Sequence, residues 1–467
     1  MAGSGLTHRL TMTLQTQGLG QQPIAALAGF AATATAVCAP HRERLALHIA
    51  DGVLALLAGQ ATCEGRALSR FHERHERSAL SLAALNAALM RHTELDDIHR
   101  PTAVTATAIA LPALLPCASA ATAERFIDAF YVGQEVAVRA AHAMGGAQLM
   151  GKGLWPSYLV APLGAAAATG RLLGLSTSRM QHALAMALAH TPRAPGKSTG
   201  ARPGRWLMFG QAVRAGCMAA LAAQDGMDGD PAYLCDETLA SIGGIDARDA
   251  TADAGAVIDA LSIKPHCAAK QALAAIEAMQ RVLALGVDPA SIDKVELFVP
   301  TAYAAMLQRE PACAGRLASM VNAGWQLALV ARAPAALDDA DRSPTPADCA
   351  VAAFAERVSV HADTALDALY PAHWPARLVV SARGERHEVL VTDSPGDPAM
   401  PFDAGQLLDK ACRVLGPSTV DPASGVACVA RALELHAQPV VVCELASRFA
   451  RPASPNQSQQ ETLHANR

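Results

Sequence analysis

The segment ELDDIH, residues 94–99, holds three carboxylates and one histidine within a few positions. The carboxylates are Glu94, Asp96 and Asp97, and the histidine is His99. Histidine can transfer a proton near neutral pH, and a neighbouring carboxylate can orient it and raise its pKa. The spacing therefore favours acid–base chemistry in which Asp96 or Asp97 orients His99.

Two other interpretations fit the same residues. Asp96 or Asp97 would cap a helix beginning at Pro101 and Thr102, because aspartate and proline both favour helix N-termini. A metal site is the other, although no second His/Asp pair at ligand spacing stands out elsewhere in the sequence. The capped turn and the acid–base site are compatible, since a cap would hold His99 rigidly beside a carboxylate.

Basic side chains gather in the glycine- and proline-containing segment 191–216. A basic loop that leads into a helix suits a multiply charged anion, and the alternative is an ordinary solvated loop. The candidates are Arg193, Lys197, Arg202, Arg205 and Arg214.

A third cluster, SIKPHCAAK, places Lys264, His266 and Lys270 around the start of an expected helix. The pattern of the sequence changes at this point, and clefts form preferentially at domain junctions. The alternative is that these are ordinary surface side chains.

The composition limits the class of protein. Of 467 residues, 51% are hydrophobic and 17% are charged, so a large core and a subunit interface are expected. Alanine is abundant, which favours closely packed helices. The net charge of −4 disfavours nucleic acid and anionic membranes as partners. The 11 dispersed cysteines and an N-terminal stretch without the apolar core of a signal peptide indicate a cytoplasmic protein with reduced thiols.

Apolar residues recur at helical spacing up to about Leu261, and strand-like alternation appears only after that point. The fold class predicted is mainly α, with a large all-helical domain and a smaller α+β lid domain. The last two of four expected strands form a hairpin, and the strands are residues 292–300, 356–363, 375–384 and 385–394. The predicted boundaries are 1–262 and 405–450 for the helical domain, 263–404 for the lid and 451–467 for a disordered tail.

Six segments, taken in order, resemble the MmgE/PrpD family, which includes 2-methylcitrate dehydratase, cis-aconitate decarboxylase and iminodisuccinate epimerase. No single motif is decisive, but together the segments cover most of the chain. They are ELDDIHRPTAVTATAIALPALL, FIDAFYVGQEVAVRAAHAMG, PLGAAAATGRLLGLSTSRMQHALAMALAH, GRWLMFGQAVRAGCMAALAAQDGMDG, IKPHCAAKQALAAI and PARLVVSARGERHEVLVTDSPGDPAMPFDAGQLLDKACRVL.

The resemblance implies a homodimer, an active site between the helical domain and the lid, and no metal or organic cofactor. It also implies a small di- or tricarboxylate as substrate. The matched positions are Glu94, Asp96 and Asp97 in the acidic motif, His99 before its proline, Lys264 in a lysine–proline motif and Tyr303 near a lid tyrosine.

Other positions depart from the pattern of the family. Trp155 stands where a histidine is common, and Arg205 replaces a lysine of the decarboxylase and epimerase branches. His266 and Lys270 replace a more usual aromatic residue and arginine, and Leu273 replaces a common histidine. These changes leave the fold implied by the resemblance intact and leave the particular reaction open.

The resulting hypothesis is dehydration of a small hydroxy di- or tricarboxylate, similar to that of 2-methylcitrate dehydratase, by acid–base catalysis. His99 would be one acid–base group, and Lys264 with His266 would oppose it or stabilise developing negative charge. The alternatives are an epimerase or isomerase, a decarboxylase, or a carboxylate-binding protein without activity. The expected substrate-binding residues are Arg205, Lys197, Arg202, Lys270, Trp155, Tyr303 and Glu94.

Overall fold

The computed structural model describes residues 22–35, 37–76, 78–191, 202, 204–231, 256–308, 315–419 and 421–449. Arg193, Lys197 and the predicted C-terminal tail lie outside these residues.

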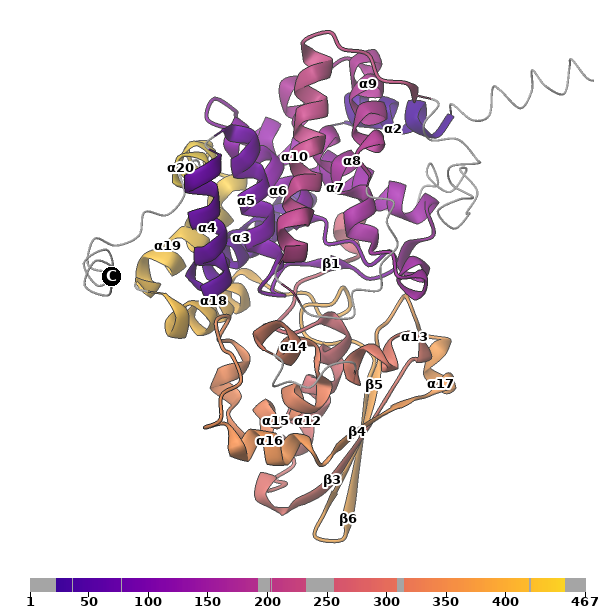
Figure 1. Ribbon diagram of the computed structural model, residues 1–467, viewed down its shortest axis with the longest axis vertical. Helices are drawn as coiled ribbons and strands as arrows, with labels where there is room; N and C mark the ends of the chain where they lie inside the picture. The colour runs from indigo at the N-terminus through magenta and orange to yellow at the C-terminus, as the bar shows by residue number, and fades with distance from the viewer. Residues whose placement is uncertain are drawn as a thin grey trace, which may run out of the picture.

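Helices dominate the first half of the chain and return at its C-terminal end (Figure 1). The C-terminal helices α18 and α19 pack on α3, so the two ends of the chain build one helical body. Its first helices are α2 (Gln22–Thr33), α3 (Ala39–Ala61), α4 (Cys63–His75), α5 (Ala79–Arg91) and α6 (Thr107–Leu114). They are followed by α7 (Ala123–Ala143), α8 (Pro156–Leu173), α9 (Thr177–Ala189) and α10 (Gly204–Gln224). The returning helices are α18 (Ala404–Ser418), α19 (Pro422–Leu433) and α20 (Val440–Phe449).

Small residues allow these helices to approach closely. A Cβ atom on Gly210 of α10 would lie 2.2 Å from the carbonyl oxygen of Ala84 in α5. Gly216 of the same helix approaches the carbonyl oxygen of Pro162 in α8 equally closely. The alanine-rich composition therefore produces the dense helix packing that it predicted.

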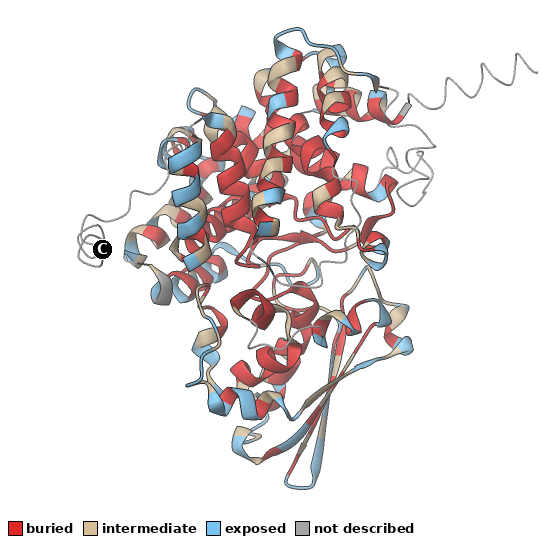
Figure 2. Cartoon of the chain, in the orientation of Figure 1, coloured by how far each residue is buried: buried red, intermediate tan, exposed pale blue. Residues whose placement is uncertain are grey.

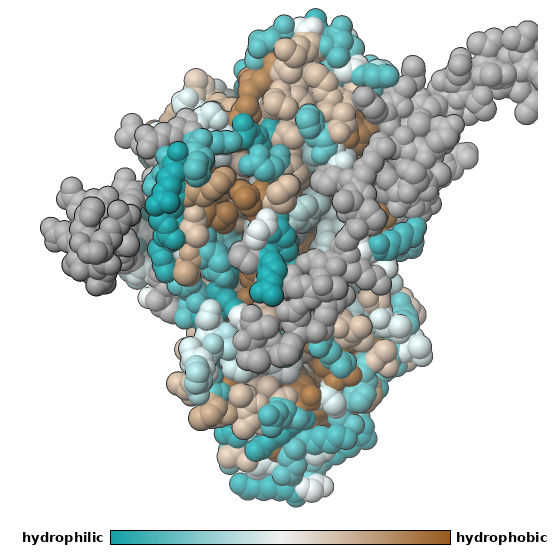
Figure 3. Space-filling view, in the orientation of Figure 1, coloured by the Kyte–Doolittle hydropathy of each residue, from teal (hydrophilic) through white to brown (hydrophobic). Residues whose placement is uncertain are grey.

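Helix α10 is long and apolar enough to cross a membrane by length and composition alone. It packs against α5, α8 and α9, and 56% of its most apolar window is buried inside the protein. In Figure 2, α10 carries buried, intermediate and exposed residues, and buried residues dominate the middle of the helical body. On the face seen in Figure 3, a hydrophilic column lies over α4, whose sequence CEGRALSRFHERH is strongly amphipathic.

An α+β region, residues 270–391, forms the lower part of Figure 1. Its four-stranded sheet has the order β4-β3-β5-β6, with β3 parallel to β4 and antiparallel to β5. The strands are β3 (Ile292–Val299), β4 (Val358–Ala362), β5 (Ala376–Ala382) and β6 (Glu385–Val391), which confirms the four predicted strands. The helices are α12 (Lys270–Ala284), α13 (Thr301–Ala304), α14 (Arg316–Val321), α15 (Ala323–Arg332), α16 (Cys349–Ala355) and α17 (Thr364–Asp367).

The predicted hairpin is formed by β5 and β6. Arg383 and Gly384 connect these strands, with φ angles of 52° and 82°. Two consecutive left-handed residues give a turn whose twist matches that of paired strands. The region also has its own hydrophobic core, in which α12 and α15 contribute buried residues beside the sheet.

A short strand pairing ties the acidic segment to the chain that leads into the α+β region. Strand β1 (Ile98–His99) pairs antiparallel with β2 (Leu261–Ser262). This pairing corrects the expectation that a helix begins at Pro101 and Thr102. Residues 100–103 form a turn instead, because the His99 amide donates to the Val104 carbonyl and closes the chain on itself.

Close packing at Gly210 gives a stability prediction. Gly210→Ala should lower the free energy of unfolding by about 1–3 kcal/mol, because the new methyl group must separate α10 from α5. Gly29→Ala in α2 is the matched control, since nothing outside its own helix and chain neighbours lies within 4 Å of its added Cβ atom. It should raise stability by about 0.5–1 kcal/mol through helix propensity. Denaturant unfolding of both variants measures the two changes, and equal effects would contradict the packing described here.

Candidate active site

The acidic turn, residues 92–97, follows α5 and is buried throughout. Glu94 has a φ of 56°, a left-handed conformation that is uncommon for residues other than glycine. The Thr93 hydroxyl accepts a hydrogen bond from the Leu95 amide at 3.4 Å. Strained backbone of this kind persists only where the surroundings hold it, and it is concentrated at functional sites.

Lys264 reaches the acidic turn from the chain just after β2. Its Nζ lies 3.3 Å from Glu94 Oε2 and 3.7 Å from Asp96 Oδ1, and the residue is only 1% exposed. The β1–β2 pairing places it there, because His99 and Leu261 are paired and Lys264 follows three residues later. Two segments that sequence analysis singled out separately therefore form one cluster.

Arg91 is a member of this cluster that sequence analysis missed. Its Nη1 lies 2.5 Å from Asp96 Oδ2, and its guanidinium stands over the Trp206 ring at 4.8 Å from the ring centre. The feature of the sequence that could have pointed to Arg91 is its position at the end of α5, a few residues before Asp96.

Arg205 completes the cluster from the first turn of α10. Its Nη2 lies 3.7 Å from Glu94 Oε1, and its guanidinium lies over the Trp206 ring at 4.0 Å. Trp155, at the start of α8, is 5.8 Å from the same guanidinium, so these two predicted residues are brought together. The Tyr158 hydroxyl donates a hydrogen bond to the Arg205 carbonyl and fixes the start of α10.

Glu94 and Asp96 of the acidic turn have opposite pKa shifts. Burial opposes ionisation of Glu94, but Lys264, Arg91 and Arg205 outweigh it and lower the pKa of Glu94 to about 2. Burial raises the pKa of Asp96, the negative charge of Glu94 adds to this increase, and Arg91 and Lys264 oppose it. A buried pair of carboxyls, one with a lowered pKa and one with a raised pKa, is typical of acid–base sites.

The cluster has more positive than negative charge, with three cations facing two carboxyls. Asp96 Oδ1, Arg205 Nε and Trp206 Nε1 are buried and have no hydrogen-bond partner among the residues that the structure describes. Buried polar atoms are ordinarily satisfied, so these atoms are candidates for contact with a ligand. An added carboxylate would supply the missing negative charge and acceptors for the Arg205 and Trp206 donors, and a substrate hydroxyl could donate to Asp96.

His99 does not have the environment expected of it. Its Nδ1 lies 2.8 Å from Thr102 Oγ1, whereas Asp97 pairs with His48 at 2.7 Å. Burial, followed by the charges of His142 and Arg100, lowers the pKa of His99 to about 3. The expectation that a carboxylate orients His99 and raises its pKa is therefore wrong, because burial dominates.

Asp97 has a capping function instead. Its Oδ1 accepts from the Thr107 amide at 3.1 Å and its Oδ2 from the Thr107 hydroxyl at 2.6 Å, at the first residue of α6. His48 of α3 is the second partner, and it was not identified from the sequence because it lies about fifty residues earlier.

Lys270 and Arg100 belong to a neighbouring network. Lys270 Nζ contacts Ser394 and Asp397 at 3.0 and 2.9 Å, and Arg100 Nη1 contacts Asp393 at 2.6 Å. Burial lowers the pKa of Lys270 despite the opposing charge of Asp397. The Arg100 contact joins the helical body to the segment after β6, and the Lys270 contacts join α12 to the same segment. Among the described residues, the partners of Lys270 are therefore structural and lie outside the acidic turn.

His266 and Tyr303, both predicted as site residues, have their hydrogen-bond partners outside the acidic turn. His266 Nδ1 pairs with Asp338 Oδ1 at 2.7 Å. Tyr303 is in the core of the α+β region, where its hydroxyl donates to the Pro375 carbonyl at 2.9 Å. Arg202 is exposed, and no group of three His, Cys, Asp or Glu residues suited to a metal ion occurs in the described part of the chain.

Comparison with known proteins identifies the family. The MmgE/PrpD N-terminal domain matches residues 45–243, and the MmgE/PrpD C-terminal domain matches residues 266–431. The protein therefore belongs to the MmgE/PrpD family.

Two curated relatives are similar over part of their length. Human cis-aconitate decarboxylase is 33% identical over 159 residues, and a cis-aconitate decarboxylase-like protein of Aspergillus oryzae is 31% identical over 158 residues. Each match covers 32% of this chain and 32% of the relative, so the matched part spans about a third of each relative's length.

The depressed pKa of His99 predicts a pH dependence of stability. In the unfolded chain a histidine titrates near pH 6.5, so the unfolded state takes up this proton first as the pH falls. The contribution of His99 to the free energy of unfolding is thus fully present above pH 6.5. It decreases below that pH by about 1.4 kcal/mol per pH unit, the value for one histidine held neutral in the folded state. His99→Gln should lose less stability than the wild type between pH 6.5 and 5 in denaturant unfolding. An identical pH dependence of the two proteins would show that His99 is not held neutral.

Proposed function

We propose that the protein is a lyase that dehydrates a small hydroxy di- or tricarboxylate by acid–base catalysis. The observation that carries the proposal is the convergence of Lys264, Arg205 and Arg91 on Glu94 and Asp96 in a buried cluster. The cluster is cationic overall and contains polar atoms without a hydrogen-bond partner in the described part of the chain, which suits a ligand with more than one carboxylate. Membership of the MmgE/PrpD family supports an enzyme that acts on such substrates.

Arg205 and Lys264 are assigned to substrate binding. Arginine presents a planar fork that matches a carboxylate, and the Arg205 Nε, which has no hydrogen-bond partner among the described residues, leaves part of that fork available. Trp155 and Trp206 hold the guanidinium between their rings and the acidic turn, which limits its conformations. Arg205 therefore takes the place of the lysine of other family branches as a binding group and not as a proton donor.

Asp96 and Lys264 are assigned to proton transfer. The Asp96 carboxylate would remove the proton from the carbon next to a substrate carboxylate, since its Oδ1 has no hydrogen-bond partner in the described residues. The Lys264 ammonium would donate a proton to the departing hydroxyl, which leaves as water. The buried cations would stabilise the negative charge that develops on the substrate carboxylate. His99, which is neutral, would position β1 and not supply the proton.

Decarboxylation is a second candidate. The observation in its favour is the similarity to human cis-aconitate decarboxylase and to the Aspergillus oryzae protein. In that reaction the same cations would hold the substrate, carbon dioxide would leave, and an acid would protonate the resulting carbanion.

We also propose that the α+β region acts as a lid over the cluster and that the protein works as a homodimer.

Incubation with a panel of carboxylates tests the function directly. Proton NMR in heavy water would follow citrate, 2-methylcitrate and cis-aconitate. A dehydratase should convert a hydroxy acid to the unsaturated acid, and a decarboxylase should release carbon dioxide from cis-aconitate. Deuterium exchange into recovered substrate with no elimination would indicate an isomerase. Binding of these acids without any turnover would contradict the proposal of a lyase.

Lys264→Met is the decisive variant in this assay. It should lower turnover by about 100-fold or more, because it removes both a charge at the substrate and the proposed acid. Lys294→Met, which removes a surface lysine paired with Glu296, is the control and should keep the wild-type rate. Equal rates for the two variants would remove Lys264 from the mechanism.

A further inference from the structure

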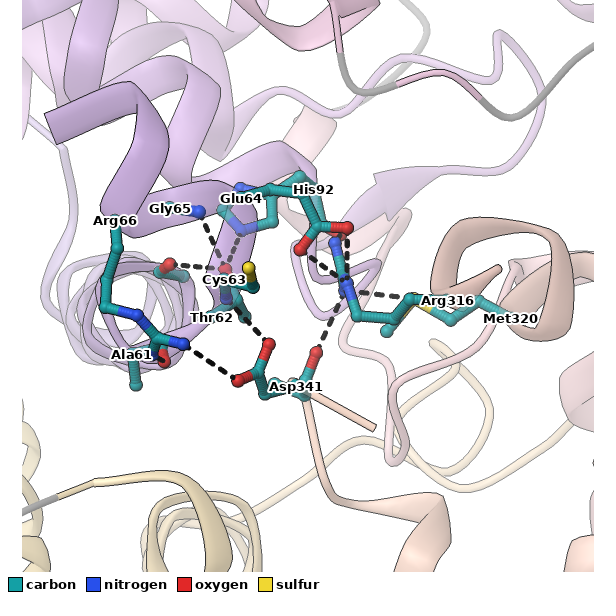
Figure 4. Close-up of polar contacts among 12 residues, drawn as sticks. Ala61, Thr62, Cys63, Glu64, Gly65, Arg66, His92, Arg316, Met320 and Asp341 are labelled. Atoms are coloured by element: carbon teal, nitrogen blue, oxygen red, sulfur yellow. Dashed lines mark hydrogen bonds and ion pairs between the residues drawn. The ribbon is translucent and has the colours of Figure 1, made fainter. Parts of the chain in front are cut away.

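Arg316 is a buried cation from the α+β region that reaches into the helical body (Figure 4). Its side chain is 2% exposed, and its Nε lies 3.0 and 2.9 Å from the two carboxylate oxygens of Glu64 in α4. Its Nη1 donates to the Ala340 carbonyl at 2.9 Å, and its Nη2 donates to the His92 carbonyl at 3.0 Å. One guanidinium therefore joins three separate segments of the chain.

The His92 carbonyl, which accepts the hydrogen bond from Arg316, belongs to the first residue of the acidic turn. The His92 ring is held by other contacts, with Nε2 at 2.5 Å from Thr62 Oγ1 and Nδ1 at 3.1 Å from the Ala88 carbonyl. Two residues later the chain adopts the left-handed conformation at Glu94, from which the carboxylate meets Lys264 and Arg205. A group that holds the backbone at the start of this turn therefore also helps to set the direction in which the Glu94 side chain points.

We propose that Arg316 is a positioning residue that sets the acidic turn according to the placement of the α+β region. It does so through its hydrogen bond to the His92 carbonyl, while the paired contact with Glu64 holds the guanidinium in place. Its consequence for substrate rests on the proposed function, since Arg316 itself contacts neither Glu94 nor Asp96. Charge-assisted hydrogen bonds of this kind are both strong and directional.

A neighbouring contact provides a matched control. Asp341, also from the α+β region, accepts from the Cys63 amide at 2.7 Å and lies 3.5 Å from Arg66 Nη2 (Figure 4). It therefore links the same region to the start of α4 without a contact to His92. A change at Asp341 perturbs the interface, whereas a change at Arg316 perturbs the interface and the acidic turn.

The test compares Arg316→Lys with Asp341→Asn in the full-length protein by hydrogen–deuterium exchange. Lysine keeps the charge but cannot serve Glu64 and two carbonyls together. Arg316→Lys should speed exchange in a peptide covering residues 93–97 by about tenfold, the loss expected for one charge-assisted hydrogen bond. Asp341→Asn should speed exchange at residues 62–66 and leave 93–97 within about twofold of the wild type.

Calorimetric titration with tricarballylate, an unreactive tricarboxylate, is the second readout. Arg316→Lys should weaken binding by about tenfold, and Asp341→Asn should leave it unchanged. Equal exchange at residues 93–97 in the two variants would reduce Arg316 to an interface residue and overturn the proposal. If the wild-type protein binds neither tricarballylate nor any acid of the carboxylate panel, the proposed function fails, and the exchange data still decide the positioning role.

Glu64→Gln guards against a folding defect in Arg316→Lys. It weakens the anchor of Arg316 but leaves both carbonyl acceptors in place. Its exchange at residues 93–97 should fall between the wild type and Arg316→Lys. Exchange at the wild-type rate in Glu64→Gln, together with no change in Arg316→Lys, would contradict the proposal.

Discussion

The buried pairing of Lys264 with Glu94 is the interaction on which the rest of the site depends. A charge removed from water is costly unless it has a partner, and removing one member of such a pair is more costly still. Lys264 and Glu94 are 170 residues apart in sequence, and their Nζ–Oε2 distance is 3.3 Å. The β1–β2 pairing brings the two segments together, and Arg91 and Arg205 supply the charge that keeps Glu94 ionised.

The acidic turn contacts the α+β region, because Arg316 donates to the His92 carbonyl, and two ion pairs lie near this contact. Arg100 contacts Asp393 beyond β6, and Arg316 contacts Glu64 in α4. A change in the placement of the α+β region would therefore alter the conformation of the acidic turn. Closure of such a region over a bound carboxylate would exclude water and strengthen every charge interaction inside.

Much of the fold could be predicted from the sequence because its signals are local. The strands and the β5–β6 hairpin follow from alternation and turn residues. Glu94, Asp96, Lys264, Arg205 and Trp155 were identified through motif order, and they do come together. Arg91, His48 and Arg316 were missed because their partners are set by tertiary packing. The pKa of His99 was misjudged since the sequence shows neighbouring charges but not burial.

Binding of an unreactive carboxylate tests most directly whether the cations around Glu94 form a carboxylate site. Tricarballylate would be titrated calorimetrically into the wild type and into Lys264→Met, with thermal unfolding used to confirm that both are folded. We predict saturable 1:1 binding per chain to the wild type and at least a tenfold loss of affinity in Lys264→Met, about the contribution of one buried ionic contact. Equal affinity of the two proteins for tricarballylate would contradict the central claim.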